Sequence, residues 1–425
     1  DASDAPPETD WRDRAERALA RARPVWALLL VALLVPLAVR AVKDARLPEP
    51  RGDTRFYVRA ARLFVAGEPL YFGGPEQRTT SYTYPPPFAA ACVWTVPLPY
   101  AAVRLVWLAL MTACAAVAAG LALRWVREAG PPLEHARPHL VLALALAPLA
   151  RFGVNDLAHG QTNWLIAALV AGSLLLLQRR RDLGAGACLG AALVIKPTAW
   201  PLLAWLLVTW RPRALAGVAL AAVVAMTPIA LRYGPAGALR EALTWLDAMA
   251  TIADLEARTG GNASLASTLH RLLAGVSLEQ GDRATLLLSL DPDATRPWAR
   301  GAVVLLVAAG FGWLALRRRA APLAPAALLP LAALLSPVTW KAHLVVLLPA
   351  TLVLARALAE DMADRRAWAA WAAIVALFTL PSRGLLDLTW AEPWGSTTAG
   401  LIALFSWVGA SHVAASPGAE RLSST

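Results

Sequence analysis

Repeated apolar runs, separated by short arginine clusters, constrain the fold of this chain more than any other feature. The first uninterrupted run, PVWALLLVALLVPLAV, extends from Pro24 to Val39. Because 58% of the 425 residues are hydrophobic, a soluble fold would leave far more apolar surface than one core can bury. The sequence therefore predicts an all-α polytopic membrane protein. Runs that could enter or span a bilayer lie near 24–42, 86–98, 101–124, 139–150, 163–177, 184–195, 198–210, 214–231, 298–316, 321–335, 344–358, 367–380 and 397–415.

Several of these runs are shorter than the roughly 20 residues that a straight span needs. Short helices broken by Pro or Gly are tolerated at membrane depth where they line a buried or watery cavity, so we expect a cavity inside the protein. If both termini lie on the same side of the membrane, the number of spans is even, and we expect about twelve. The stretch 84–100, flanked by prolines, is expected to be irregular or re-entrant.

Arginine clusters orient the chain by the positive-inside rule. We expect the Arg-rich amino terminus and the clusters near 179–181, 211–213, 317–319 and 365–366 to be cytoplasmic. The polar segments that then face outward are 43–85, 151–162, 232–297, 336–343 and 381–395.

The net charge of +11 does not indicate a nucleic-acid partner, because the arginines lie in short loops between apolar runs. Cys92, Cys114 and Cys188 all lie in apolar segments without CxxC spacing, so they predict neither a disulfide framework nor a zinc site. Asn262 matches a glycosylation sequon by chance, in a segment that we expect to form a half-buried loop helix.

An amphipathic segment with one carboxylate at its start follows the first apolar run. Arg55, Arg59 and Arg62 recur at helical spacing beside the apolar stripe of Phe56, Ala60, Leu63 and Phe64, and Gly67 is a plausible C-cap. This pattern predicts a helix in the membrane interface. Asp53 would then face both lipid and water, where an enzyme acting on a lipid headgroup would keep its base. The alternative is a solvated loop acid beside Arg51 and Arg55.

Other polar groups stand at the ends of apolar runs. YTYPPP, from Tyr82 to Pro87, either shapes a site or only starts a helix. NDLAHGQTN, from Asn155 to Asn163, is either an ordinary outer loop or a polar cluster at a cavity mouth. In the second case its side chains could bind a sugar; they include Asn155, Asp156, His159, Gln161 and Asn163.

Two further polar residues, Lys196 and His343, occupy unusual positions. Lys196 interrupts an apolar stretch between ALVI and Pro197, which favours a functional site, with snorkelling to the interface as the alternative. His343 stands at the start of another apolar run with Lys341 as its only titratable neighbour in the sequence. A lone histidine is more often structural than catalytic.

These motifs in this order resemble glycosyltransferase family 87, the polyprenol-phosphate-mannose-dependent mannosyltransferases of the glycosyltransferase C superfamily. The resemblance covers roughly residues 24 to 400 and rests on an Asp in the first outer loop, YxYPPP, HGQTNWL, LGAALVIKPT, GNASLASTLHRL and LLSPVTWKAHLVVLLPA. Asp53 matches the proposed general base of the family, Gln161 and Asn163 its GQxN segment, and Lys196 the lysine of its KP motif. His343 matches the second histidine of SPxSWxHH, whereas Ala342 replaces the first.

The resemblance implies a glycosyltransferase C fold of about 12 transmembrane helices with interfacial helices in the first outer loop. Residues 24–415 would form this domain, between cytoplasmic tails at 1–23 and 416–425. It also implies an inverting transfer, at the outer face of the plasma membrane, from a polyprenyl-phosphate sugar to a glycolipid or glycan hydroxyl. Asp53 and His343 would be catalytic. The donor phosphate would be bound by Lys196, Arg59, Arg62 and Lys341, and the sugar or acceptor by Tyr84 with the 155–163 cluster.

No cofactor and no metal are expected, and the donor sugar is expected to be mannose. Arabinofuranose on the same lipid phosphate is the alternative donor, because nothing in these residues separates a hexopyranose from a pentofuranose. A lipid or solute transporter is the alternative from a different class. A transporter would favour internal repeats and midplane charges, and the sequence shows no inverted repeat.

Overall fold

The computed structural model describes residues 11–47, 51–71, 82–129, 137–277, 283–284, 287–317, 323–361, 364–379 and 391–411. The described chain is α-helical apart from one short antiparallel pair, β1 (Val276–Ser277) with β2 (Arg283–Ala284). The α-helices are α1 (Trp11–Arg21), α2 (Arg23–Ala45), α3 (Thr54–Ala66), α4 (Pro86–Ala91), α5 (Tyr100–Ala129), α6 (Pro138–Leu146), α7 (Ala150–His159), α8 (Asn163–Gln178), α9 (Asp182–Ile195), α10 (Trp200–Val208), α11 (Pro212–Leu255), α12 (Leu265–Ala274), α13 (Pro292–Arg317), α14 (Leu328–Leu335), α15 (Leu348–Glu360), α16 (Arg365–Thr379) and α17 (Ser396–Ser411). The short 3-10 helices are η2 (Val93–Thr95), η3 (Ala147–Leu149), η4 (Pro197–Ala199), η5 (Glu256–Arg258), η6 (Ala324–Ala327) and η7 (Lys341–Leu347).

Within the described residues, five helical segments are long and apolar enough to cross a membrane: Pro24–Ala45, Tyr100–Ala129, Pro138–His159, Pro212–Arg258 and Lys341–Glu360. Shorter apolar helices accompany them at Asn163–Gln178, Asp182–Ile195, Pro197–Val208, Ala324–Leu335 and Ser396–Gly409. The chain is therefore an α-helical membrane protein that combines long and short apolar helices. The number of about twelve spans stays a prediction.

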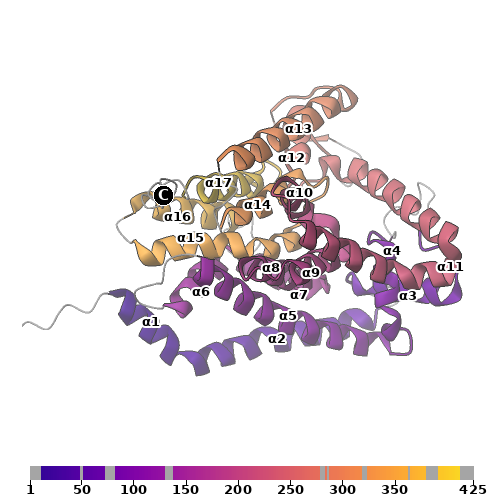
Figure 1. Cartoon of the computed structure of the whole chain (residues 1–425), viewed down its shortest axis with the longest axis horizontal. Coiled ribbons are helices and arrows are strands. Elements are labelled where there is room, and N and C mark those ends of the chain that lie inside the picture. The colour runs from indigo at the N-terminus through magenta and orange to yellow at the C-terminus, as the bar shows by residue number, and fades with distance from the viewer. Residues whose placement is uncertain are drawn as a thin grey trace, which may run out of the picture.

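The helices differ greatly in how much of their surface the protein covers. The span 341–360 is 89% buried, whereas the span 24–45 is only 11% buried and has a continuous exposed apolar surface. In Figure 1, α2 runs beside α5 along one edge of the molecule, and α8, α9 and α15 lie nearer the middle. Leucine and valine side chains that are exposed on α2 suit a bilayer rather than water.

The pair α9 and α11 packs closely because glycines face each other across it. A Cβ added at Gly186 would collide with the carbonyl of Ala214, and one added at Gly190 would lie 2.7 Å from Cβ of Ala221. A Cβ at Gly217 of α11 would in turn meet the backbone at Leu183. Small residues that let backbones approach are typical of helix pairs in membranes. This contact fixes the carboxyl end of α9, where Lys196 follows.

The predicted amphipathic helix is confirmed as α3, and its location in the membrane interface stays a prediction. It begins at Thr54 and ends at Gly67, whose left-handed φ of 76° closes the helix as a C-cap. Arg59 and Arg62 are exposed, while Tyr57 and Ala61 are fully buried. The amphipathic pattern therefore matches the face that packs against the protein.

Two segments predicted as outer loops are helical over much of their length. The range 151–162 is mostly α7, which continues the direction of α6 as part of one apolar segment. The range 232–297 begins inside α11, which is kinked at Gly234 (φ 73°, ψ 163°) and then runs on to Leu255. The apolar runs 139–150 and 214–231 stop close to the end of η3 and to the kink at Gly234, and the helical residues that follow are the part that apolarity did not indicate. By contrast, the stretch 84–100 is irregular as predicted, with a short α4 followed by η2.

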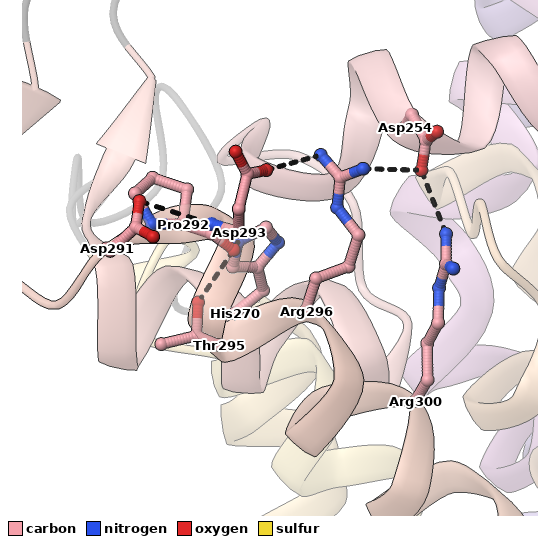
Figure 2. A network of polar contacts seen from close by, with 8 residues as sticks. All are labelled: Asp254, His270, Asp291, Pro292, Asp293, Thr295, Arg296 and Arg300. Carbon is pink, nitrogen blue, oxygen red and sulfur yellow. Dashed lines mark hydrogen bonds and ion pairs between the residues drawn. The ribbon is translucent and has the colours of Figure 1, made fainter.

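A surface network joins the end of α11 to α12 and α13 (Figure 2). Asp254 accepts a hydrogen bond of 3.0 Å from Arg300 and lies 3.7 Å from the guanidinium of Arg296. The ring of His270 donates to the carbonyl of Pro292 at 3.1 Å. Because the ionic partners are largely solvent-exposed, each pair contributes at most about 1 kcal/mol. The network therefore contributes little to holding these helices together.

Candidate active site

Asp53 stands at the first turn of α3 with its carboxylate free of the usual capping role. Its backbone N–H donates to the carbonyl of His159 at 2.8 Å, which holds the loop against the end of α7. Asp53 occupies the N-cap position, yet its side chain makes no capping hydrogen bond. A capping carboxylate ordinarily accepts from the helix N–H groups. The side chain of Asp53 is therefore available for another partner.

Burial and neighbouring cations act in opposite directions on Asp53. Desolvation raises the pKa of Asp53 above its ordinary value, and this effect is the largest. The positive charges of Lys196, His159, Arg104 and Arg55 oppose it and lower the pKa. A partly desolvated carboxylate whose pKa is raised, beside several cations, has the properties of a general base.

Lys196 reaches the same place because the chain breaks at Pro197. A proline disfavours the α conformation of the residue before it, and Lys196 is extended (φ −158°, ψ 117°) between α9 and η4. Its Nζ lies 2.5 Å from Nε2 of His343 and donates to Oδ1 of Asn163 at 3.4 Å. Lys196 thus stands among polar partners and does not snorkel away from them.

His343 comes to Lys196 from a distant part of the chain. It lies in η7, and its Nδ1 is 3.3 Å from the backbone N–H of Trp340. At 2.5 Å one nitrogen of the Lys196–His343 pair must supply a lone pair, so the pair carries at most one positive charge. Lys341, the titratable neighbour of His343 in the sequence, has another partner in the structure. Lys341 instead forms an ion pair of 2.8 Å with Glu392.

Three side chains of the 155–163 segment form one buried hydrogen-bond group. The amide Nδ2 of Asn163 donates to Oδ2 of Asp156 and to Oε1 of Gln161, both at 2.8 Å. Because both hydrogens of that amide are used, its oxygen is left to face Lys196. Gly160, with φ of 69°, ends α7 and makes the turn that brings these residues together. Oδ1 of buried Asp156 has no hydrogen-bond partner in the described structure.

Tyrosine rings form a wall beside the cation. Nζ of Lys196 lies 5.4 Å from the ring centroid of Tyr84, which is within cation–π range. The hydroxyls of Tyr84 and Tyr57 are 2.8 Å apart, and Tyr84 stacks on Phe88 at 4.8 Å. The hydroxyl of Thr162 is 3.5 Å from that of Tyr84, which links this wall to the turn after α7.

The structure brings together many of the predicted site residues but not all of them. Hydrogen bonds, ring contacts and electrostatic interactions connect Asp53, Tyr84, Asp156, His159, Gln161, Asn163, Lys196 and His343. Asn155 takes part through its backbone carbonyl, which lies 2.8 Å from Nδ1 of His159. Arg59 and Arg62 lie on the exposed face of α3, and Lys341 is held by Glu392. Their predicted part in phosphate binding stays a prediction. The described part of the chain holds no group of three or more His, Cys, Asp or Glu side chains that could bind a metal ion.

Sequence reasoning missed Arg104, which is buried and lies next to the Asp53 loop. Its guanidinium donates to the carbonyl of His159 at 3.2 Å, and its charge acts on Asp53. The signal was present, because Arg104 interrupts an apolar run as Lys196 does. Tyr57 was missed because a helical tyrosine on an apolar stripe resembles any core residue.

The arrangement described above occurs in a chain whose residues 82–338 match the model of glycosyltransferase family 87. The chain belongs to glycosyltransferase family 87. It is therefore a glycosyltransferase, and its substrates include a sugar donor and an acceptor. No curated protein and no solved structure matches the chain. The matched range contains Tyr84, Asn163 and Lys196 but neither Asp53 nor His343, which the fold brings to the same place.

Proposed function

We propose that this member of glycosyltransferase family 87 transfers mannose from a polyprenyl-phosphate donor to a hydroxyl of a glycolipid or glycan. The transfer would occur with inversion at the outer face of the plasma membrane. The observation that carries the proposal is the meeting of one free carboxylate, Asp53, with the Lys196–His343 pair. A lipid phosphate is a good leaving group, so the reaction needs chiefly a base for the acceptor and a cation for the phosphate.

In the proposed reaction, Asp53 accepts the proton of the acceptor hydroxyl. The oxygen of that hydroxyl attacks C1 of the donor sugar at the same time. The bond between C1 and the phosphate oxygen breaks, and the electron pair leaves with the polyprenyl phosphate. Lys196 stabilises the negative charge that develops on this phosphate. A single displacement inverts the configuration at C1 and needs no second carboxylate.

The other residues of the cluster would orient these groups. His343 and Asn163 limit the directions that the ammonium of Lys196 can take, because both contact its Nζ. Gln161 and Asp156 fix the amide of Asn163 and present polar atoms to a sugar. Tyr84 supplies an aromatic face beside the cation. Such a site resembles sugar sites in general, where aromatic faces and amides bind the ring.

The experiment uses membranes that contain the protein, with polyprenyl-phosphate carrying either radiolabelled mannose or radiolabelled arabinofuranose. We expect label from the mannose donor to enter an acceptor, and nuclear magnetic resonance of the product to show inversion at C1. Membranes with Asp53→Asn are the matched control and should transfer little label. If label is transferred only from the arabinofuranose donor, arabinofuranose replaces mannose as the proposed donor sugar. Use of a nucleotide-linked sugar without any lipid intermediate would overturn the proposal.

A further inference from the structure

A buried arginine connects the loop of Asp53 to the end of α7. Arg104 lies in the second turn of α5 and is only 3% exposed. One terminal nitrogen of its guanidinium donates to the carbonyl of Ala158 at 3.0 Å. The other donates to the carbonyl of His159 at 3.2 Å and to the hydroxyl of Thr54 at 3.4 Å. Thr54 follows Asp53 directly in the sequence. Ala158 and His159 lie at the end of α7, to which the backbone of Asp53 is hydrogen-bonded.

The same arginine begins a chain of hydrogen bonds that leads back to the Asp53 loop. The hydroxyl of Thr54 lies 2.8 Å from that of Tyr100, which donates to the carbonyl of Arg51 at 3.3 Å. The residues on both sides of Asp53 are thus tied to α5. Asp53 itself donates its N–H to the carbonyl of His159, which Arg104 also contacts. The position of the carboxylate therefore depends on Arg104 through both its own loop and α7.

Two glycines show how tightly this arrangement is packed. Gly52 and Gly160 have φ values of 91° and 69°, a region that L side chains rarely adopt. A Cβ at Gly160 would lie 2.7 Å from a terminal nitrogen of Arg104, and a Cβ at Gly52 would collide with the same guanidinium. The backbone thus approaches Arg104 closely from two sides.

The charge of Arg104 also has a direct effect on the site. None of the hydrogen bonds described for it goes to a carboxylate, and its acceptors include carbonyls at the negative end of α7. Its charge lowers the pKa of Asp53 and so opposes the larger effect of burial. The charged and titratable groups that interact electrostatically with Asp53 come from α3, the 82–85 segment, α5, α7 and the junction of α9 with η4; they are Arg55, Tyr57, Tyr84, Tyr100, Arg104, Asp156, His159 and Lys196.

We propose that Arg104 is a positioning residue of the transfer reaction, which holds the Asp53 loop against the end of α7. This inference rests on the proposed role of Asp53 as the base. It assigns a reaction role to a side chain that touches neither substrate, because its bonds go to backbone carbonyls and Thr54.

The test compares pH profiles of kcat for purified wild type, Arg104→Gln and Arg104→Lys with the lipid-linked donor. In Arg104→Gln we expect the acidic limb to move up by about one pH unit, because a cation near Asp53 is lost. We also expect the plateau of kcat to fall about 10- to 100-fold through misplacement of the base, with little change in donor KM. Arg104→Lys keeps the positive charge but loses the forked donors of the guanidinium. The acidic limb of its kcat profile should therefore stay at the wild-type pH, while the plateau of kcat falls.

The matched control is Arg124→Gln, which removes an exposed arginine from the same helix and should change neither the limb nor the plateau. Folding of every variant is checked by gel filtration and by tryptophan fluorescence on heating. An unmoved limb in folded Arg104→Gln, or an unchanged plateau in Arg104→Lys, would overturn the proposal. Failure of both variants to fold would indicate a purely structural role and would also overturn it.

The two hypotheses fail differently. Wild-type turnover in Asp53→Asn would remove the proposed base and with it the proposed mechanism. An inactive Asp53→Asn, combined with a wild-type profile in Arg104→Gln, would remove only the role of Arg104.

Discussion

Nζ of Lys196 lies 2.5 Å from Nε2 of His343, although 147 positions separate the two residues in the sequence. The contact joins the break after α9 to η7, so both segments must be placed correctly for either side chain to act. Because the pair carries at most one positive charge, the proton on it is able to respond to a phosphate that arrives. In the proposed reaction, this pair supplies the cation for the donor phosphate.

Lys196→Met is expected to weaken donor binding by about 1.5 to 3 kcal/mol, the range of a hydrogen bond to a charged group. Calorimetric titration of the purified variant with the polyprenyl-phosphate sugar measures the change. Lys43→Met is the control, because Lys43 is exposed on α2. Equal donor affinity in wild type and folded Lys196→Met would contradict phosphate binding by this residue.

Asp53→Asn should lower kcat by about a hundredfold or more, the scale of a lost general base, while donor affinity is kept. The acidic limb of the wild-type profile follows from the same carboxylate. Burial raises its pKa above the ordinary value of an aspartate, so activity is lost as the pH falls through that raised pKa. Steady-state rates measured from pH 8 down to pH 4 test this, and a profile that stays flat over the whole range would contradict a raised pKa of the base.

The raised pKa of Asp53 also predicts that this carboxylate, which the proposed reaction needs, lowers the stability of the folded protein. Between the unfolded and the folded pKa, the folded protein retains a proton that the unfolded chain has released. Asp53 therefore lowers the stability of the folded state as the pH rises through this window, and the loss is complete above the folded pKa. Asp53→Asn should raise the melting temperature in detergent, more at pH 8 than near pH 4. A lower melting temperature at pH 8 would show that the attraction of nearby cations outweighs burial.

Local patterns predicted the parts of the fold that local chemistry determines. The recurring arginines and Gly67 defined α3, and Pro197 defined the break at Lys196, because caps and prolines act within a few residues. Apolarity alone did not indicate that the polar stretches after residues 150 and 231 are also helical.

Contacts between distant segments could not be read from the sequence. Nothing in the residues around His343 indicates Lys196 as its partner, and the adjacent Lys341 pairs with Glu392. The group around Asp156 and Asn163 follows from the turn at Gly160, which puts residues seven positions apart in contact. Residue type pointed to the site, whereas packing of the helices selected which residues share it.

Gly160→Ala should reduce both stability and turnover. Alanine at a φ of 69° is strained by about 1 to 2 kcal/mol, and its methyl group would press on Arg104. Gly120→Ala is the matched control, because Gly120 lies inside α5 with open space around it. There alanine should be neutral or stabilise by up to about 1 kcal/mol. Thermal unfolding and kcat of both variants decide, and equal behaviour of the two would argue against a tight turn at Gly160.

The orientation of the chain in the membrane decides the class of donor as much as any side chain does. Arginines near 179–181 and 317–319 predict a cytoplasmic location, which places the Asp53 loop on the outer side, where lipid-linked sugars occur but nucleotide sugars do not. The design starts from a background in which Cys92, Cys114 and Cys188 are replaced. Glu68→Cys, exposed just beyond α3, should then react with a membrane-impermeant maleimide on intact cells, whereas Arg180→Cys should react only after permeabilisation. Permeabilised cells show that both cysteines are reactive, and retained transferase activity shows that both proteins are folded. Labelling of Arg180→Cys but not Glu68→Cys in intact cells would put Asp53 on the cytoplasmic side and favour a soluble donor.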